Sequence, residues 1–242
     1  MSDIIRPFEV LKTIQRNYST EMAKVYPDLS KLVTSITAPN DTDHRTEFPD
    51  FIGENGFIEH FHVSSGGSLS NGGYVITTIE SENEKKHYQF RKDGTDKLYR
   101  TKVIRTIENN SIENLHASLH RCFKNHIWSM GCYKGKNEIA CFLITSDDYL
   151  MLKVQRNGEM PVIDPSFGLW YNPIYDKKLL DYLYEYASAI DYVIYFNIKF
   201  GSCSYIKLAD IPDILEKYHS DNSIVYDYNS SPIVLEHEIS IS

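Results

Sequence analysis

The stretch "NEIACFLITS", residues 137–146, decides the fold class of this chain, since it is apolar at almost every position between its polar ends. A strand with one face in water alternates apolar and polar residues, whereas a continuous apolar run is typical of a strand covered on both faces. This stretch therefore predicts a central strand in a sheet that is flanked by helices.

Helical periodicity is found on both sides of this strand in the sequence. Residues 7–34 carry apolar side chains at every third or fourth position, and Pro27 is expected to divide or kink this segment. An amphipathic helix with Asn and Ser cap candidates is predicted over residues 109–128. Two further helices are predicted, one over residues 176–190 with its first residue as the cap, and a short one over residues 211–219.

The remaining strands follow from alternating and apolar runs. Residues 56–65, "GFIEHFHVSS", alternate, and the runs after them predict an antiparallel meander over residues 56–107. After a turn at Asp147 and Asp148, residues 149–155 are expected to pair back onto the central strand. Later strands are predicted over residues 191–198, 204–208 and, as an edge strand, 231–241.

Length and composition indicate one domain. The chain has 242 residues, of which 42% are hydrophobic and 24% charged, as is ordinary for a globular protein. Neither a repeat nor a low-complexity linker divides it, so the sequence predicts a single mixed α/β (α+β) domain over residues 1–242. Its core would be a central mixed β-sheet with an antiparallel meander, flanked by helices.

The cysteines and the N-terminus bear on the compartment. Four cysteines without CxxC spacing predict free, buried thiols in a reducing compartment. Residues 1–19 are interrupted by charges, which is typical of neither a signal peptide nor a membrane span. We therefore expect a cytoplasmic protein without membrane association, and the sequence does not decide whether the chain forms homo-oligomers.

Charge is distributed unevenly along the chain. The net charge of −8 argues against broad affinity for nucleic acid, yet residues 84–105 carry eight of the 25 Lys and Arg side chains against three acids. Aromatic residues lie among these bases, a combination that can neutralise phosphates and offer rings for stacking. The other interpretation is a solvated face that pairs with acids elsewhere. The candidate nucleic-acid contacts are Lys85, Lys86, Arg91, Lys92, Lys97, Arg100, Lys102 and Arg105.

A candidate metal site lies in "TEFPDFIGENGFIEHFHVSSGG", residues 46–67. Strand alternation places Glu59 between apolar neighbours on one face, where a lone carboxylate is costly unless it is paired, hydrogen-bonded or bound to metal. A hairpin return or a neighbouring strand can bring Asp50 beside it. Two converging carboxylates form the usual hard-oxygen site for Mg²⁺, which activates water and stabilises charge on a phosphodiester.

These residues resemble a known pattern. Pro49 and Asp50, a short spacer and a strand that bears Glu59 are similar to the motif of the PD-(D/E)xK nuclease superfamily, which includes many restriction endonucleases. The resemblance covers about residues 9–145 loosely. It implies a restriction-endonuclease-like core in the order α-β-β-β-α-β, with Asp50 and Glu59 as catalytic ligands of Mg²⁺.

The resemblance also implies further site residues, and the chain departs from it at one position. A helix of the family frequently supplies another Glu, for which the first helix offers Glu9 and Glu21, and Glu21 is the candidate third metal ligand. Two residues after Glu59, where the family has a catalytic Lys, this chain has Phe61. Because some members draw this Lys from another element, the replacement candidates are Lys85, Lys86 and Lys92.

His60 and His62 form an alternative metal site. An HxH pair on a strand places two imidazoles on one face, a spacing used by several metal sites, including those of the cupins. The cupin pattern needs a Glu a few residues further on, where this chain has serines and glycines, and a cupin is all-β. Two satisfied or exposed histidines are the other interpretation.

Three residues of the helix predicted over residues 109–128 form a further candidate ion site. Glu113, His116 and His120 can face one ion, but projection of the helix places His116 and His126 within its apolar stripe. Histidines in the core or at its boundary are therefore the better interpretation.

Two functions from different classes follow. One is a Mg²⁺-dependent, restriction-type nuclease that acts on DNA phosphodiesters in prokaryotic defence. The other is a non-catalytic acidic binding protein, of the immunity or inhibitor type, that engages a basic partner protein. The Pro-Asp/Glu pair and the basic segment favour the nuclease, while the missing Lys and the net charge of −8 favour the binding protein. The sequence leaves open whether the chain is an enzyme.

Overall fold

The computed structural model describes residues 6–40, 48–65, 111–133, 139–148 and 150–230. Within them, the central sheet has five strands in the order β1-β2-β3-β5-β6. The three inner strands are parallel to one another, and the two edge strands are antiparallel to their neighbours. The strands are β1 (Phe51–Ile52), β2 (Gly56–Val63), β3 (Ile139–Ser146), β5 (Tyr192–Asn197) and β6 (Ser202–Lys207).

Strand β3 is the middle of this sheet, as the opening stretch predicts. Every residue of β3 after Ile139 is buried, because β2 and β5 take its two edges and helices cover both faces. The alternation predicted for β2 is also confirmed: Phe57 and Phe61 pack in the apolar cluster on one face, and Ile58 packs in the cluster on the other.

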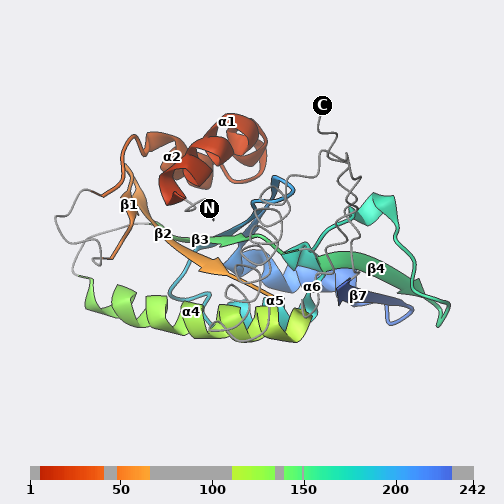
Figure 1. Ribbon diagram of the computed structural model, residues 1–242. Coiled ribbons are helices and arrows are strands. Elements are labelled where there is room, and N and C mark those ends of the chain that lie inside the picture. Colours follow the sequence, from red (N-terminus) through yellow and green to blue (C-terminus); the bar gives the residue numbers. More distant parts are fainter. Residues whose placement is uncertain (1–5, 41–47, 66–110, 134–138, 149, 231–242) are drawn as a thin grey trace, which may run out of the picture.

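One face of the sheet is covered by α1 (Pro7–Val25) and α2 (Pro27–Ser35), which lie above it in Figure 1. The two helices meet at Tyr26, since a proline disfavours helical backbone at the residue before it. The predicted division of this segment is therefore confirmed. Leu11 and Leu32 of these helices belong to the same buried cluster as Ile58 of the sheet.

The opposite face is covered by α4, α5 and α6, and α4 runs along the lower side of the sheet in Figure 1. The predicted caps are present: Ser111 Oγ accepts the Asn114 N–H at 3.1 Å, and Asp176 Oδ1 accepts the Leu179 N–H at 3.1 Å. The helix that follows Asp176 ends at Tyr184 and is therefore shorter than the predicted helix over residues 176–190. The three helices are α4 (Ile112–Cys132), α5 (Lys177–Tyr184) and α6 (Ile211–His219).

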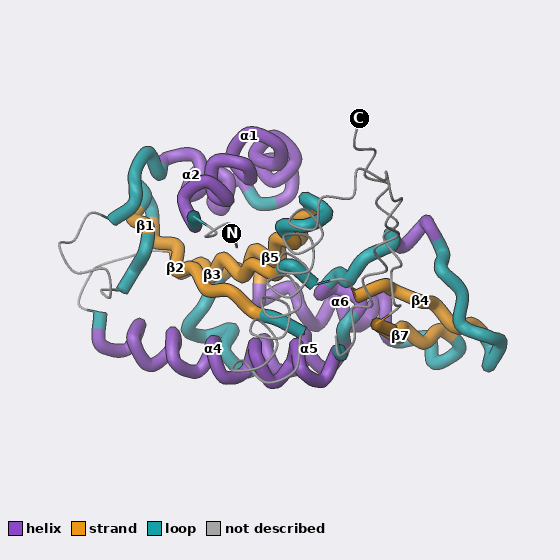
Figure 2. The backbone as a smooth tube through the Cα atoms, viewed as in Figure 1, coloured by secondary structure: helices purple, strands orange, loops and turns teal. Residues whose placement is uncertain are grey.

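Strand β4 (Leu150–Arg156) corrects one prediction. It does not pair back onto β3, but forms a separate two-stranded antiparallel sheet with β7 (Ile224–Ser230), which lies at the right of Figure 2. The reason is that both edges of β3 are already hydrogen-bonded, so a returning strand has no edge to join. Strand β7 is not predicted from the sequence.

The predicted meander is described only at its start. Among the described residues, β2 pairs with β1 along one edge and with β3 along the other. Beyond Ser65, the meander lies outside the described residues, as does the strand predicted over residues 231–241.

The cysteines are all free, and the prediction that they are buried holds only in part, since Cys141 is buried and Cys132 is exposed. None of the helices in the described part of the chain combines the length and the apolar character needed to cross a membrane.

Candidate functional site

Two carboxylates meet across the hairpin that β1 and β2 form. Phe51 pairs with Ile58 in the antiparallel register, which places Asp50 opposite Glu59. The Asp50 N–H donates a hydrogen bond of 3.0 Å to Glu59 Oε2, and the His60 N–H donates one of 2.8 Å to Asp50 Oδ2. The structure thus brings together the two acids that the sequence analysis singles out.

Burial and the mutual repulsion of the two acids both affect the pKa of Asp50. Burial, followed by the charge of the nearby Glu59, raises the pKa of Asp50 to about 6, against the opposing effect of the His60 N–H. Glu59 is itself only 6% exposed. A cation between two such carboxylates would relieve their repulsion, and the oxygen ligands fit Mg²⁺, which is commonly held by one or two carboxylates and several waters.

His126 of α4 is the third side chain of this site. Its Nδ1 lies 2.6 Å from Glu59 Oε1, and its ring stacks on Phe61 with centroids 4.8 Å apart and an interplanar angle of 17°. Sequence reasoning assigns His126 to the apolar stripe of the helix and does not connect it with Glu59. The contact could have been predicted from the sequence, since the apolar stripe of this helix and the face of the strand that carries Glu59 are both expected to face the same core.

The acidic residues of α1 do not join the pair. Glu21 is exposed on α1, which covers the face of the sheet opposite to the one that carries Glu59. Glu9 is also exposed and forms an ion pair with Lys12 at 3.6 Å. The structure therefore does not bring the expected third ligand to Asp50.

The predicted basic residues all belong to the segment of residues 84–105. The replacement lysines and the candidate nucleic-acid contacts fall outside the described residues, and these are Lys85, Lys86, Arg91, Lys92, Lys97, Arg100, Lys102 and Arg105.

The alternative HxH pair converges on a hydroxyl group. His60 Nε2 lies 2.9 Å and His62 Nδ1 lies 3.2 Å from Thr145 Oγ1 on the neighbouring strand. Burial, followed by the neighbouring His62 and His126, lowers the pKa of His60 to about 4, so its imidazole is neutral near pH 7.

In the described part of the chain, no group of three or more His, Cys, Asp or Glu side chains is placed to hold a metal ion.

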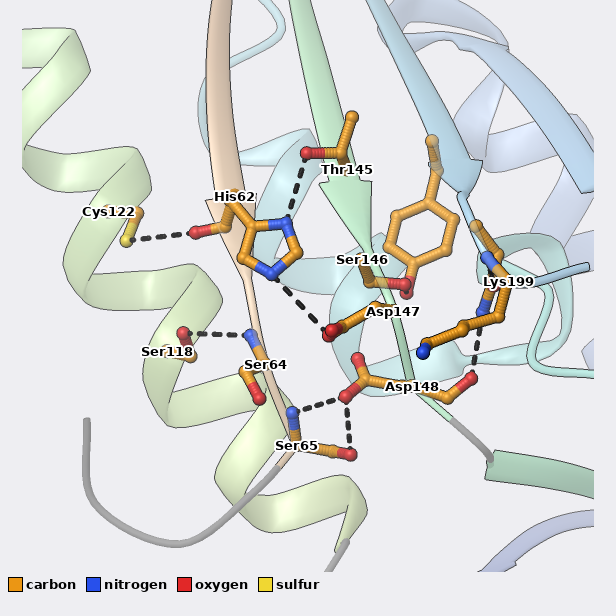
Figure 3. A network of polar contacts seen from close by, with 12 residues as sticks. His62, Ser64, Ser65, Ser118, Cys122, Thr145, Ser146, Asp147, Asp148 and Lys199 are labelled. Atoms are coloured by element: carbon orange, nitrogen blue, oxygen red, sulfur yellow. Dashed lines mark hydrogen bonds and ion pairs between the residues drawn. The ribbon is translucent and has the colours of Figure 1, made fainter. Parts of the chain in front are cut away.

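A second polar cluster lies where β2, β3 and β5 end at the same edge of the sheet (Figure 3). The Ser65 N–H and hydroxyl both donate to Asp148 Oδ1 at 2.6 Å, and the Asn197 side-chain amide donates to the Asp148 carbonyl at 3.0 Å. His62 Nε2 lies 3.5 Å from Asp147 Oδ1. The carboxyl ends of parallel strands are the usual place for ligands in open α/β sheets.

Sequence reasoning misses this cluster, because two acids after a strand are equally typical of a surface turn. Asp148 is only 2% exposed, and its Oδ2 has no hydrogen-bond partner among the residues that the structure describes. Burial raises the pKa of Asp148 to about 6, whereas the hydrogen bond with His62 lowers the pKa of Asp147. Only the tertiary structure distinguishes the two neighbours.

The histidines at the start of α4 have other partners than a shared ion. His116 Nε2 lies 2.6 Å from Asp176 Oδ2, which also accepts the Tyr171 hydroxyl at 2.9 Å. His120 stacks on Tyr182 with centroids 3.7 Å apart. His116 lines a cavity of about 450 Å³ between the ends of α4, α5 and β7. These contacts agree with histidines at the boundary of the core.

Comparison of the chain with protein-family models, with curated proteins and with solved structures gives no match.

Proposed function

We propose that the protein is a divalent-cation-dependent nuclease that hydrolyses DNA phosphodiesters, with Asp50 and Glu59 as the ligands of Mg²⁺. The observation that carries the proposal is the pairing of these carboxylates across the β1–β2 hairpin, where the pKa of Asp50 is raised to about 6 by burial and by Glu59. The resemblance of Pro49, Asp50 and Glu59 to the PD-(D/E)xK motif supports the same chemistry. A role in prokaryotic defence follows from that resemblance alone.

Both carboxylates are oriented by the protein itself. Asp50 Oδ2 is held by the His60 N–H, and Glu59 is held by the Asp50 N–H and by His126. Because Asp50 and Glu59 lie on a hydrogen-bonded hairpin, their spacing is set before a cation binds, which lowers the entropic cost of assembling the site. Bound Mg²⁺ would supply an activated water and stabilise charge on the phosphodiester.

The substrate is assigned from charge. The basic segment of residues 84–105 would neutralise backbone phosphates, and Lys85 or Lys86 would take the role of the lysine that the motif lacks. DNA affinity is then expected to fall steeply with salt, and an affinity independent of salt concentration would remove this segment from the proposal.

The proposal is tested by nicking of a supercoiled plasmid in Mg²⁺ or Mn²⁺. We expect cleavage by the parent protein and a loss of about 100-fold or more in Asp50→Asn and Glu59→Gln, which keep the shape of each side chain but remove the charge that binds the cation. Glu54→Gln is the matched control, since Glu54 lies in the same hairpin, is exposed and pairs with Lys31 at 3.6 Å. Cleavage that persists in both site variants contradicts the proposal.

The acidic binding protein remains the second candidate. The net charge of −8 favours a basic partner, and exposed apolar side chains on or beside the β4–β7 sheet offer contact area for a protein. These are Met160, Val162, Ile163 and Val225. Absence of cleavage under every condition, together with absence of cation binding, would favour this function.

A further inference from the structure

The two oxygens of Glu59 have different partners. Oε2 accepts the Asp50 N–H at 3.0 Å and so faces the hairpin, while Oε1 lies 2.6 Å from His126 Nδ1. Glu59 is 6% exposed, so these contacts, more than water, determine how its carboxylate is turned. The contact with His126 is the one that ties the hairpin to α4.

The imidazole that makes this contact is itself held in place. His126 stacks on Phe61, and its ring also meets Phe142 edge to face, with centroids 6.4 Å apart. Phe61 and Phe142 are buried in one cluster with Phe123, which lies one turn before His126 on α4. Packed aromatic rings therefore fix the plane of the imidazole from two sides.

Phe61 occupies the same face of β2 as Glu59, because residues two apart on a strand point the same way. At this position the chain has an apolar ring that stacks on His126, whereas the PD-(D/E)xK motif has a lysine. The polar partner of Glu59 on this face is therefore His126, which belongs to α4 and not to the strand.

We propose that His126 is a positioning residue for the cation site: it holds the Glu59 carboxylate in the orientation in which Glu59 and Asp50 bind one divalent cation. This inference rests on the proposed function. Groups that orient a metal ligand by a hydrogen bond change metal affinity by about 10–100-fold when they are removed.

The competing explanation is that His126 only compensates the burial of Glu59 and has no effect on cation binding. The same helix supplies a matched control for this explanation. His116 also lies 2.6 Å from a buried carboxylate, but this carboxylate belongs to Asp176 at the start of α5 and not to the β1–β2 hairpin. Loss of either the His126–Glu59 or the His116–Asp176 pair is expected to lower the free energy of unfolding. Only loss of the His126–Glu59 pair is expected to lower the affinity for the cation.

The experiment is a Mn²⁺ titration of the full chain, with free Mn²⁺ followed by its electron paramagnetic resonance signal. We expect His126→Leu to weaken Mn²⁺ affinity about 10–100-fold. His126→Asn, whose amide nitrogen replaces Nδ1 at the same number of bonds from the backbone, is expected to restore affinity to within about threefold of the parent. His116→Leu is expected to leave the affinity unchanged, and circular dichroism verifies that each variant is folded.

A second pair keeps the test decisive if His126→Leu does not fold. His126→Gln keeps a polar side chain but moves the donor one bond further out, so Asn and Gln variants of equal affinity overturn the inference. Asp50→Asn and Glu59→Gln separate the two proposals. If they abolish Mn²⁺ binding while the His126 variants bind like the parent, only the positioning role fails. If they too bind like the parent, the cation site itself is wrong.

Discussion

Asp147 and Asp148 are neighbours in the sequence, yet their carboxyl groups lie in opposite electrostatic environments at the end of β3. The side chain of Asp147 is 44% exposed and lies 3.5 Å from His62, whereas the whole of Asp148 is buried, and one of its oxygens has no hydrogen-bond partner among the described residues. The first environment favours a charged carboxylate and the second disfavours it.

The first prediction concerns the pH dependence of stability. The pKa of Asp148 is raised to about 6 in the folded protein, so its contribution to stability is present below about pH 4 and is lost as the pH rises through 6. In Asp148→Asn this loss is absent. We expect the free energy of unfolding of the variant, relative to the parent, to rise by up to about 3 kcal/mol between pH 4 and pH 7, measured by urea denaturation.

Asp147→Asn is the control for this experiment, because the sign is opposite. The pKa of Asp147 is lowered by its hydrogen bond with His62, so its contribution is present at neutral pH and is lost as the pH falls through its folded-state pKa. The variant is expected to be less stable than the parent at pH 7 and closer to it in acid. Parallel pH profiles for both variants would contradict the assignment.

The second prediction concerns cation removal. If Asp50 and Glu59 bind a divalent cation, Mn²⁺ at about 100 times its dissociation constant stabilises the folded state by about 2.7 kcal/mol relative to EDTA. Thermal unfolding of the parent should therefore shift upward with Mn²⁺ and that of Asp50→Asn should not. In EDTA, Asp50→Asn is expected to be at least as stable as the parent, since it removes the repulsion between the two acids. An equal Mn²⁺ shift in both proteins would argue against this site.

The third prediction concerns close packing at the start of β2. A Cβ atom on Gly56 would overlap the carbonyl oxygen of Ile139 on β3, and backbone cannot move aside as a flexible side chain can. Gly56→Ala is expected to destabilise the fold by about 2 kcal/mol or more. Gly131, within α4, has nothing within 4 Å of such a Cβ, so Gly131→Ala is expected to stabilise by about 0.5 kcal/mol. Chemical denaturation of both variants measures the difference.

The fourth prediction concerns the buried carboxylate of Asp176, which accepts the Leu179 N–H, the Tyr171 hydroxyl and the contact from His116. Asp176→Ala removes the cap of α5 and leaves these donors unpaired, with an expected loss of about 3 kcal/mol in the free energy of unfolding. Asp181→Ala, an exposed position on the same helix, is expected to change stability by about 0.5 kcal/mol or less. Similar losses in both variants would contradict the role of Asp176.

Local sequence patterns predict much of this fold, for a reason that is visible in particular elements. The apolar run at residues 139–146 predicts β3, the break at Pro27 separates α1 from α2, and Ser111 and Asp176 mark the starts of two helices. Each of these signals is local, because an apolar run, a proline or a capping side chain acts on residues that are close to it in the sequence.

The pairing of strands and the hydrogen-bond partners of polar side chains depend instead on residues that are far apart in the sequence. Residues 149–155 suit a strand, but whether they return to β3 depends on β5, which follows much later and takes that edge. In the same way, the acids after β3 suit a surface turn until Ser65 and Asn197 bury Asp148.

The sequence by itself determined that the chain forms a mixed α/β fold, that β3 is a central strand and that Glu59 points to the same face as Phe57 and Phe61. Periodicity suffices for these results, because side-chain direction within one element depends only on its own backbone. The sequence proposes Asp50 as a partner of Glu59, and only the tertiary structure decided that the two residues meet and that His126 joins them. Such contacts join residues on different elements, and their distances are set by how the hairpin and α4 pack on the common core.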